Sequence, residues 1–212
     1  MCQFKSAMVV KAGEDYRLFY LDDGDSHEEI RKKFDIRDTG PLCKATPVEL
    51  VPVRGFRGPD DCNFVFDAGK PDWWDESWTD GIKTELYYVA ARQLKGEKYK
   101  DLNLGGLTSA AGLTLPETVT GWLDLSGLTS AAGLTLPKTV SGGLYLGGLT
   151  SAAGLTLPKT VSGWLDLCGL TSAAGLTLPK TVSGGLDLSG LTSADRQELR
   201  ARYPKLRIYG RG

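Results

Sequence analysis

The chain has little of what most catalytic and metal sites require. It contains one histidine and four cysteines, and no two of those cysteines stand at CxxC spacing. A single histidine, His27, excludes a metal site with several histidine ligands. A zinc site made from it with Cys2, Cys43 and Cys62 would need four distant segments to converge, so we expect no metal and no cofactor. Cys168 stands where equivalent segments carry serine or glycine, and reduced thiols in a cytosol are the simplest interpretation of the cysteines.

Long apolar runs and a surplus of one charge are also absent. No segment approaches the ~20 apolar residues of a membrane span, and the first residues do not form a signal peptide. We therefore expect a soluble, cytoplasmic protein without a membrane partner. The formal net charge of −1 gives no clustered basic surface for phosphate groups. The arginines and lysines of residues 196–211 are interpreted as a solvated end of the fold, so no nucleic-acid partner is predicted.

The motifs of common catalytic folds are missing too, because there is no P-loop, no GxGxxG after a predicted strand and no GxSxG. The acidic run 22–25 lacks EF-hand spacing and is predicted to cap a helix, on which His27 is a solvated surface side chain. Removal of Met1 would make Cys2 an N-terminal thiol, the nucleophile of the amidotransferase class, which the chain resembles at Met1-Cys2 alone. We predict no enzyme and keep as the alternative an enzyme with Cys2 and His27 chemistry and the repeats as a targeting module. Rapid, selective labelling of Cys2 by a thiol probe would favour that alternative.

Residues 1–101 are irregular, charged and rich in aromatic residues, and their pattern predicts a small α+β domain. Ser26 followed by Glu29 forms a capping box that begins a helix at His27. The tryptophans of residues 73–78 are expected to anchor a second helix on the sheet. The expected elements are strands over 3–10, 16–21, 48–53 and 63–66, a helix over 27–34, and a helix over 82–94 that stops at Gly96.

From Leu107 onward the sequence repeats almost letter for letter. The tetrapeptide LTSA recurs every 21 residues, at Leu107, Leu128, Leu149, Leu170 and Leu191. A fixed period of this size indicates a solenoid, because so small a unit must stack on its neighbours to bury its leucines. We therefore predict an α+β domain over 1–101, a leucine-rich-repeat-like parallel β-solenoid over 102–193 and a helix–strand cap over 194–212.

Alternation within each repeat orients the side chains. In Leu123-Asp124-Leu125 the leucines point to the core and the aspartate points outward, and equivalent segments stack as one parallel sheet with strands ~4.8 Å apart. Val119 and its equivalents are expected to fill a bend, and glycines such as Gly112 to form the corners. A second wall is expected from the Leu-Thr-Leu segments, each followed by proline, at 113–115, 134–136, 155–157 and 176–178.

The repeat LTSAAGLTLPKTVSGWLDL resembles a leucine-rich repeat of the BspA-like kind, with the rhythm LTSxxIPxxVxxI. The resemblance covers about Leu102 to Ser193 and rests on the order of leucine, proline and valine positions. The repeats here are shorter, and they lack the AFxxC turn and the asparagine of typical leucine-rich repeats. Near-identical copies of this kind also resemble uncharacterised phage and prophage proteins. This resemblance implies a host protein, such as a defence or regulatory protein, as the natural partner.

The last repeat changes after Ser193, where the chain reads ADRQELR. Asp195 and Glu198 form a second capping box, which predicts a helix to about Arg202. A further strand is expected over 206–208. The basic helix would then cover the open end of the solenoid against edge-to-edge association.

The outward side of the first sheet is the predicted binding surface. Exposed tryptophan and tyrosine are enriched in binding hot spots, and the tryptophans of alternate coils stand ~10 Å apart. Because aromatic residues and glycine alternate from coil to coil, the alternative is that each indole shields the glycine backbone of the neighbouring coil. The predicted contact residues are Trp122, Asp124, Tyr145, Trp164, Asp166 and Asp187.

These observations together predict a non-catalytic protein-binding module. A further alternative is ice binding by the threonine rows Thr114 to Thr177 and Thr108 to Thr192, which unshaped ice crystals in the presence of the protein would exclude. Strand propensity and the need for small polar residues facing outward explain the same rows. The sequence leaves open whether an exposed sheet edge pairs two chains into a homodimer.

Overall fold

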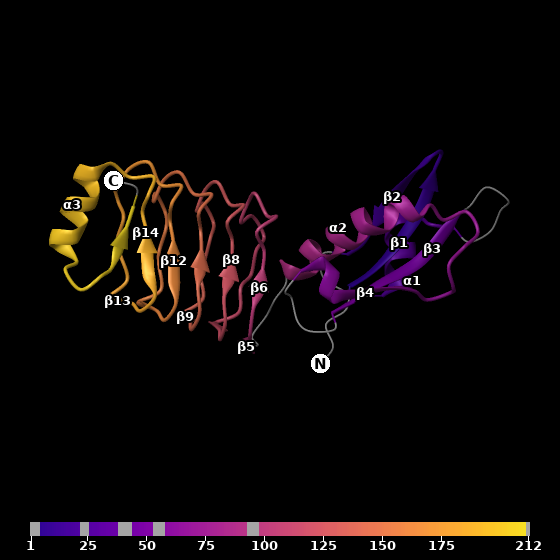
Figure 1. Cartoon of the computed structure of the whole chain (residues 1–212). Helices are drawn as coiled ribbons and strands as arrows, with labels where there is room; N and C mark the ends of the chain where they lie inside the picture. Colours follow the sequence, from indigo (N-terminus) through magenta and orange to yellow (C-terminus); the bar gives the residue numbers. More distant parts are fainter. Residues whose placement is uncertain (1–4, 22–25, 38–43, 53–57, 93–97, 211–212) are drawn as a thin grey trace. The chain divides into compact units, whose positions relative to one another are not determined.

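The computed structural model describes residues 5–21, 26–37, 44–52, 58–92 and 98–210, which form two compact units (Figure 1). The first unit ends at Ala90 and the second begins at Ala91. As predicted, an antiparallel α+β unit is followed by a parallel β-solenoid with a short C-terminal helix. In the described ranges, no helix combines the length and the apolar character that crossing a membrane requires.

The first unit is built on a four-stranded antiparallel sheet with the order β2-β1-β3-β4. The predicted hairpin is confirmed, with Ala12 paired to Asp15 across its turn. The two strands expected further along also form, and Val48 pairs with Phe66. The strands are β1 Lys5–Ala12, β2 Asp15–Phe19, β3 Ala45–Pro52 and β4 Cys62–Phe66, and short 3₁₀ turns lie at η1 Pro59–Asp61 and η2 Glu76–Trp78.

Helix α1 spans His27–Phe34 and begins where the capping box predicted it. The hydroxyl oxygen of Ser26 accepts a hydrogen bond from the backbone N–H of Glu29 at 3.3 Å. This bond satisfies one of the N–H groups that the first turn of a helix leaves without an intrahelical partner. Ile30 is fully buried and packs against Met8 of β1, so α1 covers one face of the sheet.

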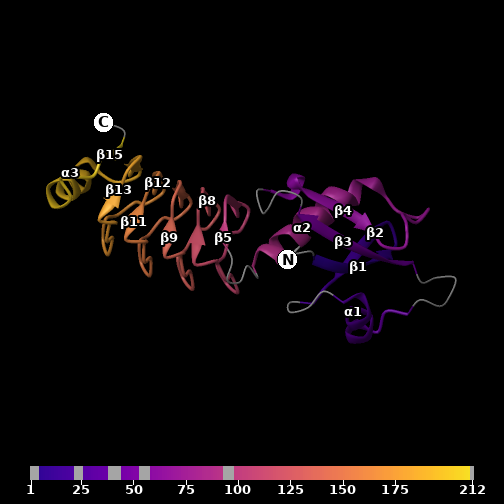
Figure 2. The same cartoon turned by 90° about the horizontal axis from the view of Figure 1, so that it is seen from below.

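Helix α2 spans Thr79–Ala91 and covers the opposite face of the sheet (Figure 2). The tryptophans before it anchor it as predicted, since Trp74 and Trp78 are buried with ring centroids 5.8 Å apart. Trp74 also packs edge-on against Phe66 of β4, with centroids 4.7 Å apart. The predicted end of this helix, at residues 94–96, lies outside the described residues.

The second unit begins its first sheet at Leu102, and the order of that sheet is β15-β14-β12-β10-β8-β6. Equivalent residues of successive coils pair in register, as Leu144 does with Leu123 and Leu165. These leucines are fully buried, which confirms their inward direction. The strands are β6 Leu102–Asn103, β8 Leu123–Asp124, β10 Leu144–Tyr145, β12 Trp164–Asp166, β14 Gly185–Asp187 and β15 Ile208–Tyr209.

The second sheet is formed by other segments than those predicted. The Leu-Thr-Leu segments contain no strand. The N–H of their first leucine is used in a turn, as when Leu134 N–H donates to Ala131 O at 3.0 Å, and the proline that follows each segment has no N–H to continue a ladder. The following Thr-Val segments are held from coil to coil by hydrogen bonds at both ends: Thr139 N–H donates to Glu117 O at 3.4 Å, and the N–H of Ser141, just after the strand, donates to Val119 O at 2.9 Å. The valines are thus the inward residues of this sheet rather than fillers of a bend. Its strands are β5 Lys98–Tyr99, β7 Thr118–Val119, β9 Thr139–Val140, β11 Thr160–Val161 and β13 Thr181–Val182.

The predicted corner at Gly112 is confirmed by its backbone. Gly112 has a φ of 71°, and the equivalent glycines of the next three coils have φ values of 74° to 76°. This left-handed region is open to glycine at no steric cost, because glycine has no Cβ atom. Each coil therefore turns at a position that the repeat keeps as glycine.

Helix α3, Ser193–Arg202, follows the last repeat as predicted, but its cap differs from the predicted one. Thr192 is the N-cap residue, and its hydroxyl accepts a hydrogen bond from Asp195 N–H at 3.2 Å and donates one to the Asp195 carboxylate at 2.7 Å. The capping pair therefore begins three residues earlier than the predicted pair of Asp195 and Glu198. The reason is that Thr192 directly precedes the first helical residue, where a side-chain oxygen can accept from the free N–H groups of the first turn, whereas Asp195 already lies inside the helix. The last strand begins at Ile208, later than predicted.

Candidate functional site

The outward side of the first solenoid sheet brings the predicted contact residues onto one surface. Alternation directs Leu123 and Leu125 into the core, where both are fully buried, and leaves Asp124 half-buried on the outside. Equivalent outward residues lie side by side because the strands pair in register, which the row of arrows in Figure 1 makes visible. We call this surface the aromatic–acidic face, and its residues are Trp122, Asp124, Tyr145, Trp164, Asp166, Asp187 and Tyr209.

Three aromatic rings of this face, those of Tyr145, Trp164 and Tyr209, lie on glycines of the sheet. A Cβ atom at Gly185 would stand 2.7 Å from the Trp164 ring and 2.6 Å from the Tyr209 ring, so both rings cover that glycine. The two ring centroids are 5.1 Å apart, with an angle of 30° between the planes. A Cβ atom at Gly143 would stand 3.0 Å from the ring of Tyr145. Trp164 thus shields the backbone of the next coil, as the alternative interpretation expects, and part of its surface still reaches solvent.

Tyr209 belongs to this face although the sequence reasoning missed it. It is 47% exposed and pairs with Asp187 of the neighbouring strand. The predicted strand ended one residue too early, at Ile208. The signal was present in the alternation, because an inward Ile208, which is 8% exposed, directs the next side chain outward.

The aspartates of the face also close turns. In Asp124, Asp166 and Asp187, the Oδ1 atom accepts a hydrogen bond from the backbone N–H two residues further along, at 2.8 to 2.9 Å. This is the Asx-turn geometry by which aspartate stabilises the end of a strand. One oxygen of each carboxylate is therefore committed to the fold. The donors are the N–H groups of Ser126, Cys168 and Ser189.

Two of these aspartates stand on adjacent coils, because Asp166 pairs with Asp187 in the sheet. Like charges directly across a strand pair are destabilising, and the strand spacing is only ~4.8 Å.

The thiol of Cys168 lies beside these aspartates. Burial raises the pKa of Cys168 to about 11, and the hydrogen bond and charge of Asp166 and the charge of Asp187 raise it further. Cys168 therefore stays a neutral thiol at physiological pH, in keeping with a small residue in a repeat slot.

The threonine rows of the ice-binding alternative lie outside the second sheet. Thr135, Thr156 and Thr177 are exposed, but they stand in segments without a strand. The outward hydroxyls of the second sheet belong instead to residues such as Thr139 and Thr160. Ice binding by the predicted rows stays a prediction.

The alternative enzyme with Cys2 and His27 chemistry also stays a prediction, since Cys2 lies outside the described residues. Cys62 is 4% exposed, and burial raises its pKa to about 11 although the charge of Lys83 acts in the opposite direction. A thiol that remains protonated near neutral pH is a poor nucleophile and a poor metal ligand. Cys62 is therefore a core residue of the first unit.

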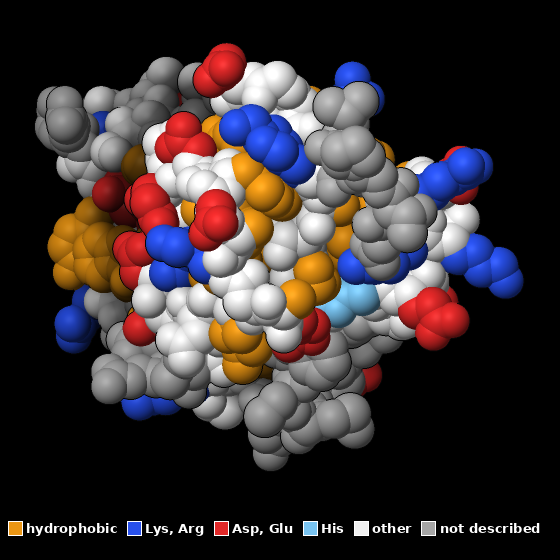
Figure 3. All heavy atoms as spheres, turned by 90° about the vertical axis from the view of Figure 1, so that its right-hand side faces the viewer, with side chains coloured by type: hydrophobic (Ala, Val, Ile, Leu, Met, Phe, Trp, Pro, Cys, Tyr) orange, Lys and Arg blue, Asp and Glu red, His pale blue; other side chains and the backbone are white. Residues whose placement is uncertain are grey.

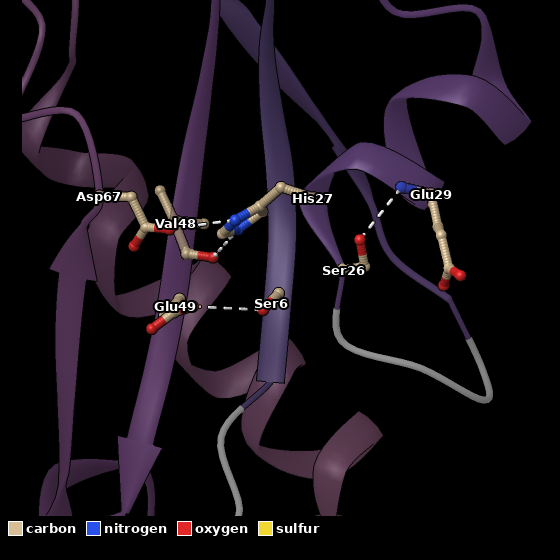
Figure 4. A network of polar contacts seen from close by, with 7 residues as sticks. All are labelled: Ser6, Ser26, His27, Glu29, Val48, Glu49 and Asp67. Atoms are coloured by element: carbon tan, nitrogen blue, oxygen red, sulfur yellow. Dashed lines mark hydrogen bonds and ion pairs between the residues drawn. The ribbon is translucent and has the colours of Figure 1, made fainter.

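His27 was predicted to be a solvated surface side chain, and the structure corrects this. Its side chain is only 19% exposed, with Nε2 3.1 Å from the carbonyl oxygen of Val48 and Nδ1 3.0 Å from Oδ2 of Asp67 (Figure 4). The reason is the sheet register, which places the end of β4 beside β3 under the start of α1. Glu49 lies in the same network. Among the described residues, the ligand atoms of His27, Glu49 and Asp67 lie within 4.8 Å of one another.

Sequence reasoning missed this second cluster because its members are far apart in the chain. Glu49 is an outward residue in the middle of a strand, and Asp67 follows the next strand, so no short motif contains either with His27. In Figure 3 the only histidine reaches the surface with acidic side chains beside it. Comparison with protein-family profiles, with curated proteins and with solved structures finds no significant match for the chain.

Proposed function

We propose that this protein is a non-catalytic protein-binding module and that the aromatic–acidic face is its contact surface. The observation that carries the proposal is the row of rings Trp122, Tyr145, Trp164 and Tyr209 on one side of a single sheet. Tryptophan and tyrosine are among the residues most enriched in binding hot spots. The rings of Tyr145, Trp164 and Tyr209, already held against glycines, lose little further freedom on association, which favours affinity.

The length of the row suits a partner segment of ordinary size. From the coil of Trp122 to the coil of Tyr209 there are four strand spacings of ~4.8 Å, so the rings extend over about 19 Å. An α-helix of about 13 residues has the same length, at 1.5 Å per residue. One secondary-structure element of a partner therefore suffices to contact the whole row.

The charge of the face favours a basic partner. Asp124, Asp166 and Asp187 lie along one line of the sheet, and two of them are on adjacent coils. A lysine or arginine of the partner placed over this line would offset the repulsion between the carboxylates. Complementary charge of this kind raises the association rate and suppresses wrong partners more than it adds affinity.

The source of the partner is proposed from the sequence resemblance. The order of leucine, proline and valine in each coil resembles BspA-like leucine-rich repeats and uncharacterised phage and prophage proteins. This supports a phage-encoded protein in the cytoplasm that inhibits or modulates a host protein, such as a defence protein. Stacked repeats of this size also serve mainly as extended binding surfaces, which supports a role in binding rather than catalysis.

The test is affinity capture from host lysate with the intact protein and two sets of variants. Replacing Trp122 and Trp164 by alanine should abolish capture of the partner, because it removes two of the four aromatic rings of the face. Replacing Asp124, Asp166 and Asp187 by asparagine keeps the Asx-turn acceptors and removes the charges. Because salt already screens these charges, the variant should capture less partner than the intact protein mainly at low salt.

The matched control replaces Lys159 and Lys180 by alanine, which removes two exposed side chains from the same solenoid but not from this face. Capture should survive in this variant. Circular dichroism must show cooperative unfolding for every variant. A partner that the double tryptophan variant still captures would contradict the proposal.

A further inference from the structure

We propose that His27, Glu49 and Asp67 form a binding site for a divalent first-row transition-metal ion. The site lies in the first unit and is independent of the binding face of the solenoid. Its three side chains come from the first residue of α1, the middle of β3 and the residue after β4 (Figure 4). One imidazole and two carboxylates are a donor set that zinc, manganese and related ions accept.

The orientation of the imidazole is the first argument. Nε2 of His27 stands 3.1 Å from the carbonyl oxygen of Val48, which can only accept a hydrogen bond. Nε2 therefore carries a hydrogen and donates it. A histidine that binds a metal characteristically donates its other ring N–H to a backbone carbonyl or a carboxylate, which fixes the tautomer and the ring.

The contact on the other nitrogen is the second argument. With the hydrogen on Nε2, the neutral ring presents the lone pair of Nδ1 to Oδ2 of Asp67, only 3.0 Å away. A lone pair and a carboxylate at this distance repel each other unless a positive charge lies against both. Two ligands at about 2.1 Å from one metal ion are about 3.0 Å apart in octahedral and about 3.4 Å apart in tetrahedral geometry, so the observed 3.0 Å suits adjacent positions on one ion.

The third ligand makes a metal ion a better occupant than a proton. A proton can bridge only His27 and Asp67, whereas a metal ion can also bind Glu49, since an oxygen of that carboxylate lies within 4.8 Å of both other ligand atoms. The Ser6 hydroxyl, which is 3.4 Å from Oε1, holds the Glu49 side chain on this side of the sheet. Two carboxylates and one neutral imidazole carry a charge of −2, which a divalent ion neutralises.

The fold positions these ligands without help from an ion. The cap at Ser26 fixes the start of α1, and the backbone N–H of Asp67 donates to Pro47 O at 3.3 Å, which fixes Asp67 beside β3. The positive end of the α1 dipole opposes a cation here, but the two full carboxylate charges outweigh it. Asp67 has a side chain that is 33% exposed, so water can complete the coordination shell.

The test is titration of the full-length protein with Co²⁺, followed by visible absorption, with Zn²⁺ as the competitor. One equivalent should bind, without the charge-transfer band of a thiolate ligand, and Zn²⁺ should displace it. His27→Ala and Asp67→Asn should each weaken binding by about tenfold or more, since loss of even an outer partner of a ligand costs 10- to 100-fold. Glu28→Gln removes one exposed charge from the same helix and should leave the affinity unchanged.

Asp67→Asn is nearly isosteric and near the surface, so it keeps the test valid if His27→Ala fails to fold. Bound Zn²⁺ should also raise the unfolding temperature of the intact protein, and this shift should be lost in Asp67→Asn. The proposal is overturned by the absence of binding, by a thiolate band in the Co²⁺ spectrum, or by equal affinities of Asp67→Asn and Glu28→Gln. Absence of binding would assign the His27–Asp67 contact to a proton.

Discussion

The two units place the same residue type in opposite positions. In the first unit, Trp74 and Trp78 are buried beneath the sheet, whereas in the solenoid Trp122 and Trp164 lie half-exposed on the outer face. The interior of each coil is filled by leucine and valine from two closely facing sheets, and protein interiors leave few voids. An indole therefore has to lie outside a 21-residue coil. A large aromatic residue therefore fills the core of the first unit but lies on the outer surface of the second.

The largest expected effect tests this difference directly, with Trp74→Ala in the first unit against Trp122→Ala in the solenoid. Trp74 packs against Phe66 and Trp78, so its loss should lower the free energy of unfolding of the first unit by about 3–5 kcal/mol. Trp122→Ala should cost less than about 1 kcal/mol, because a half-exposed ring leaves no cavity. Urea denaturation followed by circular dichroism measures both. Similar losses for the two variants would show that Trp122 is a core residue of the solenoid.

The sequence predicted the solenoid because its period and its inward leucines are local and repeated. The second sheet was mispredicted because the Leu-Thr-Leu alternation is the stronger strand pattern, although a turn uses the N–H of Leu134 and Pro137 has no N–H to continue a ladder. Thr-Val is too short to stand out by alternation, although it keeps its N–H groups.

The candidate sites were predictable to different degrees. The aromatic–acidic face follows from one strand pattern copied along the chain, so most of its residues could be named in advance. The cluster of His27, Glu49 and Asp67 depends on the register between β3 and β4 and on where α1 begins. Such pairing between distant segments is set by packing in three dimensions, and no periodic pattern in one sequence records it.

A substitution with a smaller expected effect tests how closely the backbones of successive coils stack in the solenoid. A Cβ atom at Gly163 would stand 2.5 Å from the carbonyl carbon of Gly142 in the preceding coil. Backbone cannot move aside as a side chain can, so Gly163→Ala should destabilise the solenoid by about 1–3 kcal/mol. The free energy of unfolding of the first unit should not change.

The control for this substitution is Gly154→Ala in the same repeat. Gly154 has a φ of 76° and no contact closer than 4.0 Å, so alanine there meets only the backbone preference, about 1 kcal/mol. Thermal unfolding of both variants, followed by circular dichroism, separates steric contact between coils from backbone strain. A smaller loss for Gly163→Ala than for Gly154→Ala would mean that the coils can move apart to admit a methyl group.

The smallest expected effect concerns the helix caps, which the two units share. Thr192→Ala should lower the free energy of unfolding of the solenoid by about 1 kcal/mol, because it removes the acceptor for Asp195 N–H, and Ser26→Ala should cost the first unit about as much. Glu198→Ala is the matched control, since Glu198 is exposed and the cap does not use it. If Glu198→Ala lowered the free energy of unfolding as much as Thr192→Ala does, the cap predicted from sequence, Asp195 with Glu198, would be the correct one. A loss confined to Thr192→Ala means that the helix starts at the first hydroxyl after the last inward leucine, Leu191, so the repeat itself sets where the solenoid ends.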